Sequence, residues 1–285
     1  MSTMKSLLAV LAVFQALALN AAVAQSTAAA RLIAINADRS LWMRCVGRGQ
    51  PVVVLEAGHT EASDTWEQVQ ARVASLTRVC SYDRAGRGRS TPAPGGPRSG
   101  NDVVQDLRAM LHAAQERGPY LLVGHSLGGA FIRLYAASFP HDVAGLVLVD
   151  AVHEREFAAL DELLTPAQRA AGAGMRPLSP ERLDIEAVFK ELAALRQRFS
   201  VPLIVVARGQ PLANDEMPPD WTVEQQRRRE ELRQALQAEL ATLSPAGELV
   251  VAERSGHFVQ HDQPEVVAAA IRKLVQRWRE GRAGR

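Results

Sequence analysis

Residues 120–129 read YLLVGHSLGG, an apolar run that leads directly into a glycine-rich turn. The run predicts a buried strand, and the apolar spacing of 127–138 behind the turn predicts a helix. Ser126 therefore lies in the pattern G-x-S-x-G between a strand and a helix, the setting of a nucleophile elbow. We take Ser126 as the candidate nucleophile. The backbone N–H of Leu127, at the helix N-terminus, is a candidate donor to an oxyanion.

Apolar strands and amphipathic helices alternate on both sides of this segment. The predicted strands are 32–36, 41–46, 52–55, 78–82, 120–123, 146–149, 203–207 and 249–252. The predicted helices include 66–76, 103–111 (capped by Asn101 or Asp102), 127–138, 221–243 and 264–278. This alternation indicates an α/β protein with a mostly parallel central sheet and helices on both faces. Segment 153–200 is helical without a strand, so we expect a helical cap inserted over one end of the sheet.

The composition excludes several classes of protein. The 285 residues carry 33 Lys plus Arg against 31 Asp plus Glu, and a net charge of +2 is too balanced for a dedicated nucleic-acid binder. Two cysteines are too few for a zinc ribbon. No metal-ligand cluster, phosphate loop or dinucleotide motif occurs in the sequence, so we expect no cofactor and no metal. The run 227–231 (RRREE) is expected to be a solvated helix face.

The first 24 residues have the pattern of an export signal. Lys5 supplies a positive charge, 7–19 an apolar core, and 22–24 (AVA) a cleavage pattern of small residues. An uncleaved membrane anchor is the alternative, but this apolar run is shorter than the roughly 20 residues that span a bilayer. Cleavage would leave one domain, 25–285, in the periplasm or outside the cell, with no stable membrane span.

Export changes what the two cysteines imply. Cys45 and Cys80 lie in predicted strands near the start of the sheet. Thiols outside the reducing cytosol tend to pair, so we predict a Cys45–Cys80 disulfide. Two buried free cysteines are the alternative.

Four motifs, in order along the chain, resemble those of the α/β-hydrolase family. They are 55–59 (LEAGH), 82–90 (YDRAGRGRS), 124–129 (GHSLGG) and 255–258 (SGHF), the last followed by 262–265 (DQPE). The resemblance implies the α/β-hydrolase fold and a second oxyanion donor, the backbone N–H of His59. Glu56 and Ala57 depart from the hydrophobic residue and histidine that many members carry. A backbone donor does not depend on those side chains. Asp83 and Arg84 are expected to brace their turn.

Ser126 needs a base within hydrogen-bond reach, because a serine hydroxyl is a weak nucleophile at neutral pH. Of the seven histidines, His257 follows the last predicted strand and satisfies the chain order serine, acid, histidine. His261 in the same loop is the alternative. His125 lies inside the elbow, and we expect its side chain to point away from the Ser126 hydroxyl.

Two aspartates could accept the second ring proton of the base and stabilise its charged form. Asp150 follows the strand 146–149 at the carboxyl edge of the sheet. Asp215 lies in a proline-rich loop beyond the strand 203–207, the commoner place for the acid in the family. We favour Asp150 and keep Asp215 as the alternative acid.

These groups predict an exported serine hydrolase. We expect a carboxylesterase whose partner is a small-molecule acyl substrate, a small or medium apolar ester, bound through an acyl-enzyme on Ser126. Amide cleavage, C–C hydrolysis and perhydrolysis could use the same residues. A non-catalytic binding protein on the same fold is a further alternative. Serine at the elbow disfavours dehalogenase and epoxide hydrolase chemistry, in which a carboxylate forms the covalent ester.

Overall fold

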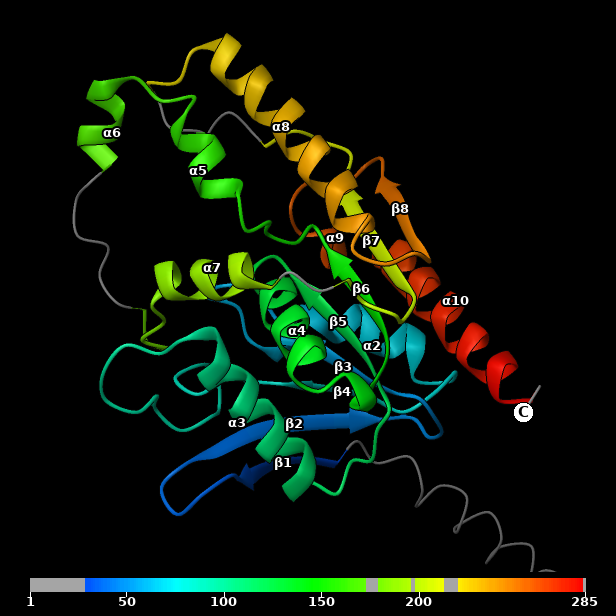
Figure 1. Ribbon diagram of the computed structural model, residues 1–285. Coiled ribbons are helices and arrows are strands. Elements are labelled where there is room, and N and C mark those ends of the chain that lie inside the picture. The colour runs from blue at the N-terminus through cyan, green and yellow to red at the C-terminus, as the bar shows by residue number, and fades with distance from the viewer. Residues whose placement is uncertain (1–28, 173–178, 196–197, 213–219, 284–285) are drawn as a thin grey trace, which may run out of the picture.

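The centre of the protein is an eight-stranded sheet in the order β1-β2-β4-β3-β5-β6-β7-β8 (Figure 1). This computed structural model describes residues 29–172, 179–195, 198–212 and 220–283. The strands are β1 (Ala29–Ala34), β2 (Ser40–Val46), β3 (Val52–Glu56), β4 (Val79–Tyr82), β5 (Tyr120–His125), β6 (Val143–Val149), β7 (Leu203–Arg208) and β8 (Gly247–Ala252).

Strand direction places the candidate site residues at one edge of this sheet. Every neighbouring pair from β4 across to β8 is parallel, and only the pairings of β2 with β1 and β4 are antiparallel. The prediction of a mostly parallel sheet is therefore confirmed. Because parallel strands share one carboxyl edge, residues that follow β3, β5, β6 and β8 gather there.

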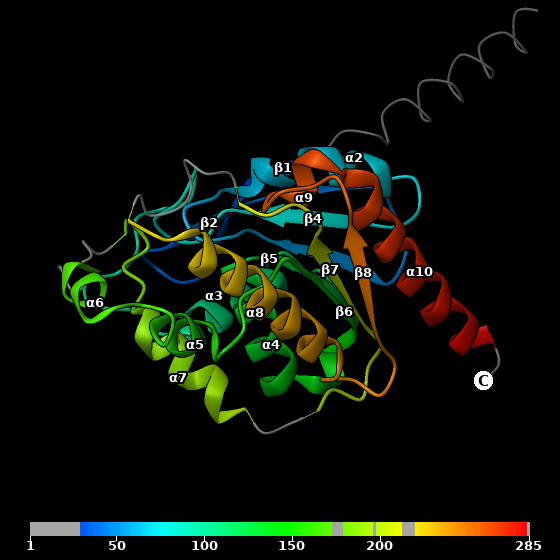
Figure 2. The ribbon, with the colours of Figure 1, turned by 90° about the horizontal axis from the view of Figure 1, so that it is seen from above.

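Helices cover both faces of the sheet. One face carries α2 (Glu67–Val73) and α10 (Pro264–Ala283), and the other carries α3 (Gly100–Ala113), α4 (Leu127–Ser138) and α8 (Val223–Ala241) (Figure 2). Strand β3 shows why both faces need cover: Val52 and Val54 pack into one hydrophobic cluster, Val53 and Leu55 into the other. Successive side chains of a strand point to opposite faces, so a continuous apolar run must be buried twice.

The described part of the segment between β6 and β7 contributes three helices, α5 (Glu156–Asp161), α6 (Pro166–Gly172) and α7 (Ile185–Ala194). Helix α7 packs against α3 and α4, and α5 packs against α8. Short helical turns complete the fold: η1 (Ser63–Trp66), η2 (Pro140–Asp142) and α9 (Val259–Asp262). The described part of 153–200 thus holds helices and no member of the sheet, as its sequence predicts.

Helix α3 begins earlier than its sequence suggested. The predicted cap at Asn101 or Asp102 is wrong: Ser99 is the N-cap and accepts a hydrogen bond from Asp102 N at 3.2 Å. Asp102 accepts from Ser99 N in return at 2.8 Å, which makes it the third residue of a reciprocal capping box. The apolar periodicity starts at Val103, and the polar first turn that precedes it does not reveal which residue is the cap.

Cys45 and Cys80 are directly opposite each other on β2 and β4, and a disulfide joins them. The predicted pairing is present, and both residues are buried. The export signal lies outside the described residues. None of the helices in the described ranges is long and apolar enough to cross a membrane.

Candidate active site

Ser126 occupies the turn between β5 and α4. Its backbone has φ 51° and ψ −121°, a conformation that residues with a side chain rarely adopt. Its N–H donates to Val149 O at 3.0 Å, and its carbonyl accepts from Gly129 N at 3.0 Å. Strain of this kind persists where the surroundings fix it, and it clusters at functional sites. The strand–turn–helix expected from the sequence is present, with Ser126 at its tip.

Two glycines allow this turn to pack closely. A Cβ placed on Gly124 would lie 2.5 Å from Gly128 O, and one on Gly128 would lie 2.5 Å from Ala57 O. Both distances are shorter than any real Cβ contact, so a side chain at either position would push α4 away from β5 or from the loop after β3. The G-x-S-x-G pattern therefore reflects backbone crowding around Ser126.

Asp150 and His257 form the second part of the site. Asp150 directly follows β6 and His257 lies in the loop between β8 and α9. His257 Nδ1 lies 2.6 Å from Asp150 Oδ2. Of the two candidate acids, the structure pairs Asp150 with His257, whereas Asp215 lies outside the described residues. The alternative base His261 is engaged elsewhere, with its Nε2 2.9 Å from Thr65 Oγ1.

Ser126 is held next to this pair by its neighbours. Its N–H is bound to the carbonyl of the residue before Asp150, and the ring of His125 contacts the carbonyl of His257 at 2.9 Å. No hydrogen bond joins Ser126 Oγ to His257 within the described part of the chain. Because Asp150 engages Nδ1, Nε2 is the ring nitrogen of His257 that remains to act on Oγ.

Two arginines surround the carboxylate of Asp150, which is fully buried. The guanidinium of Arg233, on α8, contacts Oδ2 directly. The backbone N–H of Arg208, at the end of β7, donates to Oδ1 at 3.3 Å. The Arg208 Nε lies 3.7 Å from Oδ2. Burial alone would raise the pKa of Asp150, but the charge of Arg233 and the hydrogen bonds from His257 and Arg233 hold the pKa below its ordinary value. Asp150 is therefore an anion at any physiological pH.

The pKa of His257 also lies below its ordinary value. Burial is the main cause, since it disfavours the charged imidazolium. The hydrogen bond to Asp150 raises the pKa, whereas the charges of His125 and Arg233 lower it. His257 is thus neutral at neutral pH, which is the state required of a general base.

The loop after β3 is held against the elbow by Arg84. Its Nη1 donates to Ala57 O at 2.6 Å and its Nη2 donates to Gly58 O at 2.7 Å. A Cβ on Gly58 would lie 3.2 Å from Ser126 Cβ, so this loop touches the nucleophile. His59 follows Gly58 and lines the same pocket as Ser126. Arg84 therefore has a structural role, as expected, but it braces the loop that carries the candidate second oxyanion donor and not its own turn.

Buried acids balance the charge of Arg84. Its guanidinium contacts Glu56 at 2.6 Å and Glu181, from the chain before α7, at 2.6 Å, and all three are buried. Tyr82 donates a hydrogen bond to Glu56. Burial raises the pKa of Glu56, and Arg84 opposes that rise. The departure at Glu56 thus supplies an acceptor for Arg84, a role that the motif alone did not reveal.

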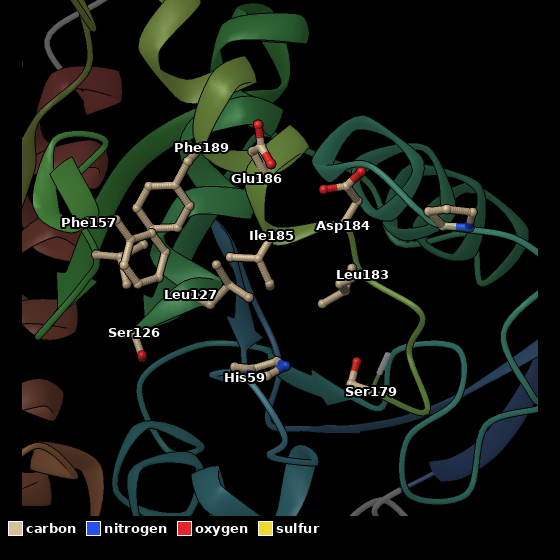
Figure 3. A pocket seen from close by; sticks show the side chains of 12 residues that line it. His59, Ser126, Leu127, Phe157, Ser179, Leu183, Asp184, Ile185, Glu186 and Phe189 are labelled. Atoms are coloured by element: carbon tan, nitrogen blue, oxygen red, sulfur yellow. The ribbon is translucent and has the colours of Figure 1, made fainter. Parts of the chain in front are cut away.

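A pocket of about 570 Å³ opens at Ser126 (Figure 3). The residues that line it are His59, Pro97, Ser126, Leu127, Val152, Phe157, Ser179, Leu183, Asp184, Ile185, Glu186 and Phe189. Phe157 of α5 and Phe189 of α7 have their ring centroids 4.4 Å apart. In Figure 3 the Ser126 hydroxyl points away from these two rings. Helices α5 and α7 thus supply an apolar wall of the pocket that Ser126 lines.

Among the described residues, the one group with metal-ligand spacing is Cys45, Cys80 and Glu116. The two sulfurs of this group are bonded to each other and are not available as thiolate ligands. The group also lies apart from the pocket at Ser126, whose lining includes none of its members.

Comparison with known proteins agrees with this architecture. The model of the alpha/beta hydrolase family matches residues 47–270. This chain belongs to the alpha/beta hydrolase family. Among relatives, it is 28% identical over 231 residues to the uncharacterized protein YqjL of Bacillus subtilis, which covers 79% of this chain and 83% of that protein.

Solved structures of this family share the fold at low sequence identity. One is a thermophilic esterase from Thermogutta terrifontis, with 19% identity, a TM-score of 0.62, and coverage of 88% of this chain and 99% of the esterase. Another is a haloalkane dehalogenase variant from Bradyrhizobium elkanii, with 17% identity, a TM-score of 0.64, and coverage of 90% and 99%. The fold thus hosts different hydrolytic reactions, and the argument for function rests on the site.

Two polar side chains around Asp150 were not found from the sequence: Arg233 and Arg208. Arg233 lies on the charged helix α8, where the run 227–231 was expected to be solvated throughout. That expectation is wrong for Glu230, which accepts a hydrogen bond from the buried Arg208 at 2.6 Å. A spacing of three between Glu230 and Arg233 places both on one face of α8, and this face is the only signal in the sequence.

Replacing Arg233 by glutamine should lower stability and make His257 more basic. Arg233→Gln leaves the Asp150 anion with fewer partners, so we expect a loss of about 3 kcal/mol in the free energy of unfolding at pH 7. At that pH the pair's contribution is fully present, since the pKa of Asp150 is lowered and its stabilisation disappears only in acid. Denaturant unfolding measures the loss, and NMR titration of His257 should show a higher midpoint.

Arg227→Gln is the matched control on the same helix. Its side chain is exposed and pairs with Glu224 and Glu231 at the surface, so we expect almost no change in the free energy of unfolding. Equal stability of the two variants would contradict the role assigned to Arg233.

Proposed function

We propose that this protein is an exported serine hydrolase that cleaves carboxylic esters of small or medium apolar molecules. The observation that carries the proposal is the 2.6 Å contact between His257 Nδ1 and Asp150 Oδ2 beside a serine held at positive φ. A neutral imidazole oriented by a buried carboxylate, next to a serine that lines a pocket, is the arrangement that activates a serine nucleophile.

In the proposed reaction, Ser126 Oγ attacks the carbonyl carbon of the ester while His257 Nε2 takes the hydroxyl proton. Catalytic hydrogen bonds are commonly long without substrate, so Oγ and Nε2 need to come within about 3 Å only in the substrate complex. The backbone N–H groups of Leu127 and His59 stabilise the oxyanion. His257 then protonates the leaving alcohol, and water activated by the same imidazole releases the acid from Ser126.

The pocket supports an apolar substrate. Leu127, Val152, Phe157 and Phe189 line it near Ser126. Burying an apolar group of the ester against them contributes about 25 cal/mol per Å² of surface removed from water. Because the candidate nucleophile is a serine, the covalent intermediate would be an acyl ester of Ser126, whereas the intermediate of a dehalogenase is an alkyl ester of an aspartate.

Removing the Ser126 hydroxyl should abolish hydrolysis without unfolding the protein. Ser126→Ala is expected to lower kcat/KM toward short p-nitrophenyl esters by about 10⁴-fold or more, because only oxyanion stabilisation and binding would remain. Steady-state rates across a series of acyl lengths measure the loss. Ser138→Ala, at the exposed far end of the same helix α4, should retain the rate of the unaltered protein. Undiminished turnover in Ser126→Ala would refute the proposal.

The export part of the proposal rests on the sequence of residues 1–24. Expression of the full chain in a Gram-negative host should yield extracytoplasmic protein whose intact mass corresponds to residues 25–285. Leu11→Arg, which places a charge in the apolar core of the signal, should leave the chain in the cytoplasm. Recovery of uncleaved protein from the cytoplasm in both cases would contradict export.

A further inference from the structure

A second carboxylate–histidine pair lies beneath the elbow. His125, the residue before Ser126, is buried, and its Nδ1 lies 2.5 Å from Glu61 Oε2. Its other ring nitrogen, Nε2, lies 2.9 Å from the carbonyl oxygen of His257. The imidazole of His125 therefore bridges the loop after β3 and the loop that carries the proposed base.

The hydrogen-bond donors around the Glu61 carboxylate decide its charge. Its two oxygens face four donors: Gly58 N at 2.7 Å, Thr65 Oγ1 at 2.5 Å, Gln260 Nε2 at 3.1 Å and His125 Nδ1. Burial alone would raise the pKa of Glu61, but the hydrogen bond and charge of His125, with the bonds from Thr65 and Gly58, lower it to about 2. Glu61 is an anion, and only hydrogen-bond donors surround it.

Both ring nitrogens of His125 face hydrogen-bond acceptors. Nδ1 faces the Glu61 carboxylate, and Nε2 faces a carbonyl oxygen, which can only accept. Gln260 Nε2 is also 3.2 Å from Nδ1, but its two protons are directed to Glu61 Oε1 and Thr65 Oγ1. Among the described residues no donor is left to serve a bare Nδ1, so both ring nitrogens have the partners that suit an imidazolium.

We propose that His125 is a cationic positioning residue: held by Glu61, it fixes the backbone of His257 and disfavours protonation of the His257 ring. This inference rests on the proposed role of His257 as the base. The two imidazole centroids lie only 4.6 Å apart. A cation so close favours the neutral base, and the ion pair with Glu61 keeps that cation in place.

Other charges also face the two rings and must be included. His257 faces Asp150 from β6, with Arg233 of α8 and Arg208 of β7 behind that carboxylate. His125 faces Glu61 on one side and His257 on the other, and His261 of α9 is connected to Glu61 through Thr65. Together these charges keep the His257 ring neutral to a lower pH. They also make His257 a weaker base.

Nitrogen NMR of the ¹⁵N-histidine-labelled protein tests the charge without any substrate. At pH 7.5, a value chosen about one unit above the ordinary histidine pKa, both ring nitrogens of His125 should bear protons. In His125→Gln the midpoint of the His257 titration should rise by about one pH unit, and the acidic limb of kcat/KM should shift with it. A role confined to packing would change stability but leave both midpoints in place.

Two further variants separate the outcomes. Glu61→Gln removes the anion that keeps the proton on Nδ1, so His125 should lose one ring proton and the His257 midpoint should again rise. His112→Gln, an exposed histidine of α3, should change nothing. A singly protonated His125 in the unaltered protein, or an unmoved His257 midpoint in folded His125→Gln and Glu61→Gln, would overturn the inference. Both NMR results stand whether or not Ser126→Ala loses ester hydrolysis, so failure of the proposed function is recognised separately.

Discussion

The hydrogen bond between Asp150 and His257 is the interaction on which the site depends. It spans 107 residues of sequence, and it forms because β6, β7 and β8 are parallel neighbours whose carboxyl ends share one edge. The same edge receives Ser126 from β5, whose last residue pairs with the end of β6. Sheet topology thus brings together three groups that are far apart in the sequence.

Buried charge holds the segments around this site in place. Arg84 holds the loop after β3, Arg233 and Arg208 hold Asp150, and Glu61 holds His125. Buried ion pairs contribute little net stability compared with apolar packing, because each charge loses its hydration. Their geometric effect is larger: each one fixes a segment that the proposed reaction would use. The site is therefore a set of loops positioned by charge on a sheet stabilised by apolar burial.

The features that depend on short-range spacing in the sequence were predicted correctly. The elbow, the eight strands and the position of His257 follow from short-range spacing, since G-x-S-x-G and apolar runs report the backbone directly. The partner of His257 remained open between Asp150 and Asp215, because both follow strands and only the tertiary position decides. The charge partners Glu61, Arg208 and Arg233 were missed for the same reason, since nothing local marks which charged side chain turns inward. The export signal and Asp215 lie outside the described residues, and those hypotheses still rest on sequence alone.

The most direct test of this account is the rate at which a fluorophosphonate labels Ser126 when Asp150 is replaced by asparagine. If Asp150 orients His257 and the imidazole activates the serine, Asp150→Asn should slow labelling by about 10⁴-fold while the protein stays folded. Peptide mapping should place the label on Ser126 in the unaltered protein. Labelling of Asp150→Asn at the unaltered rate, or labelling of another serine, would contradict the account.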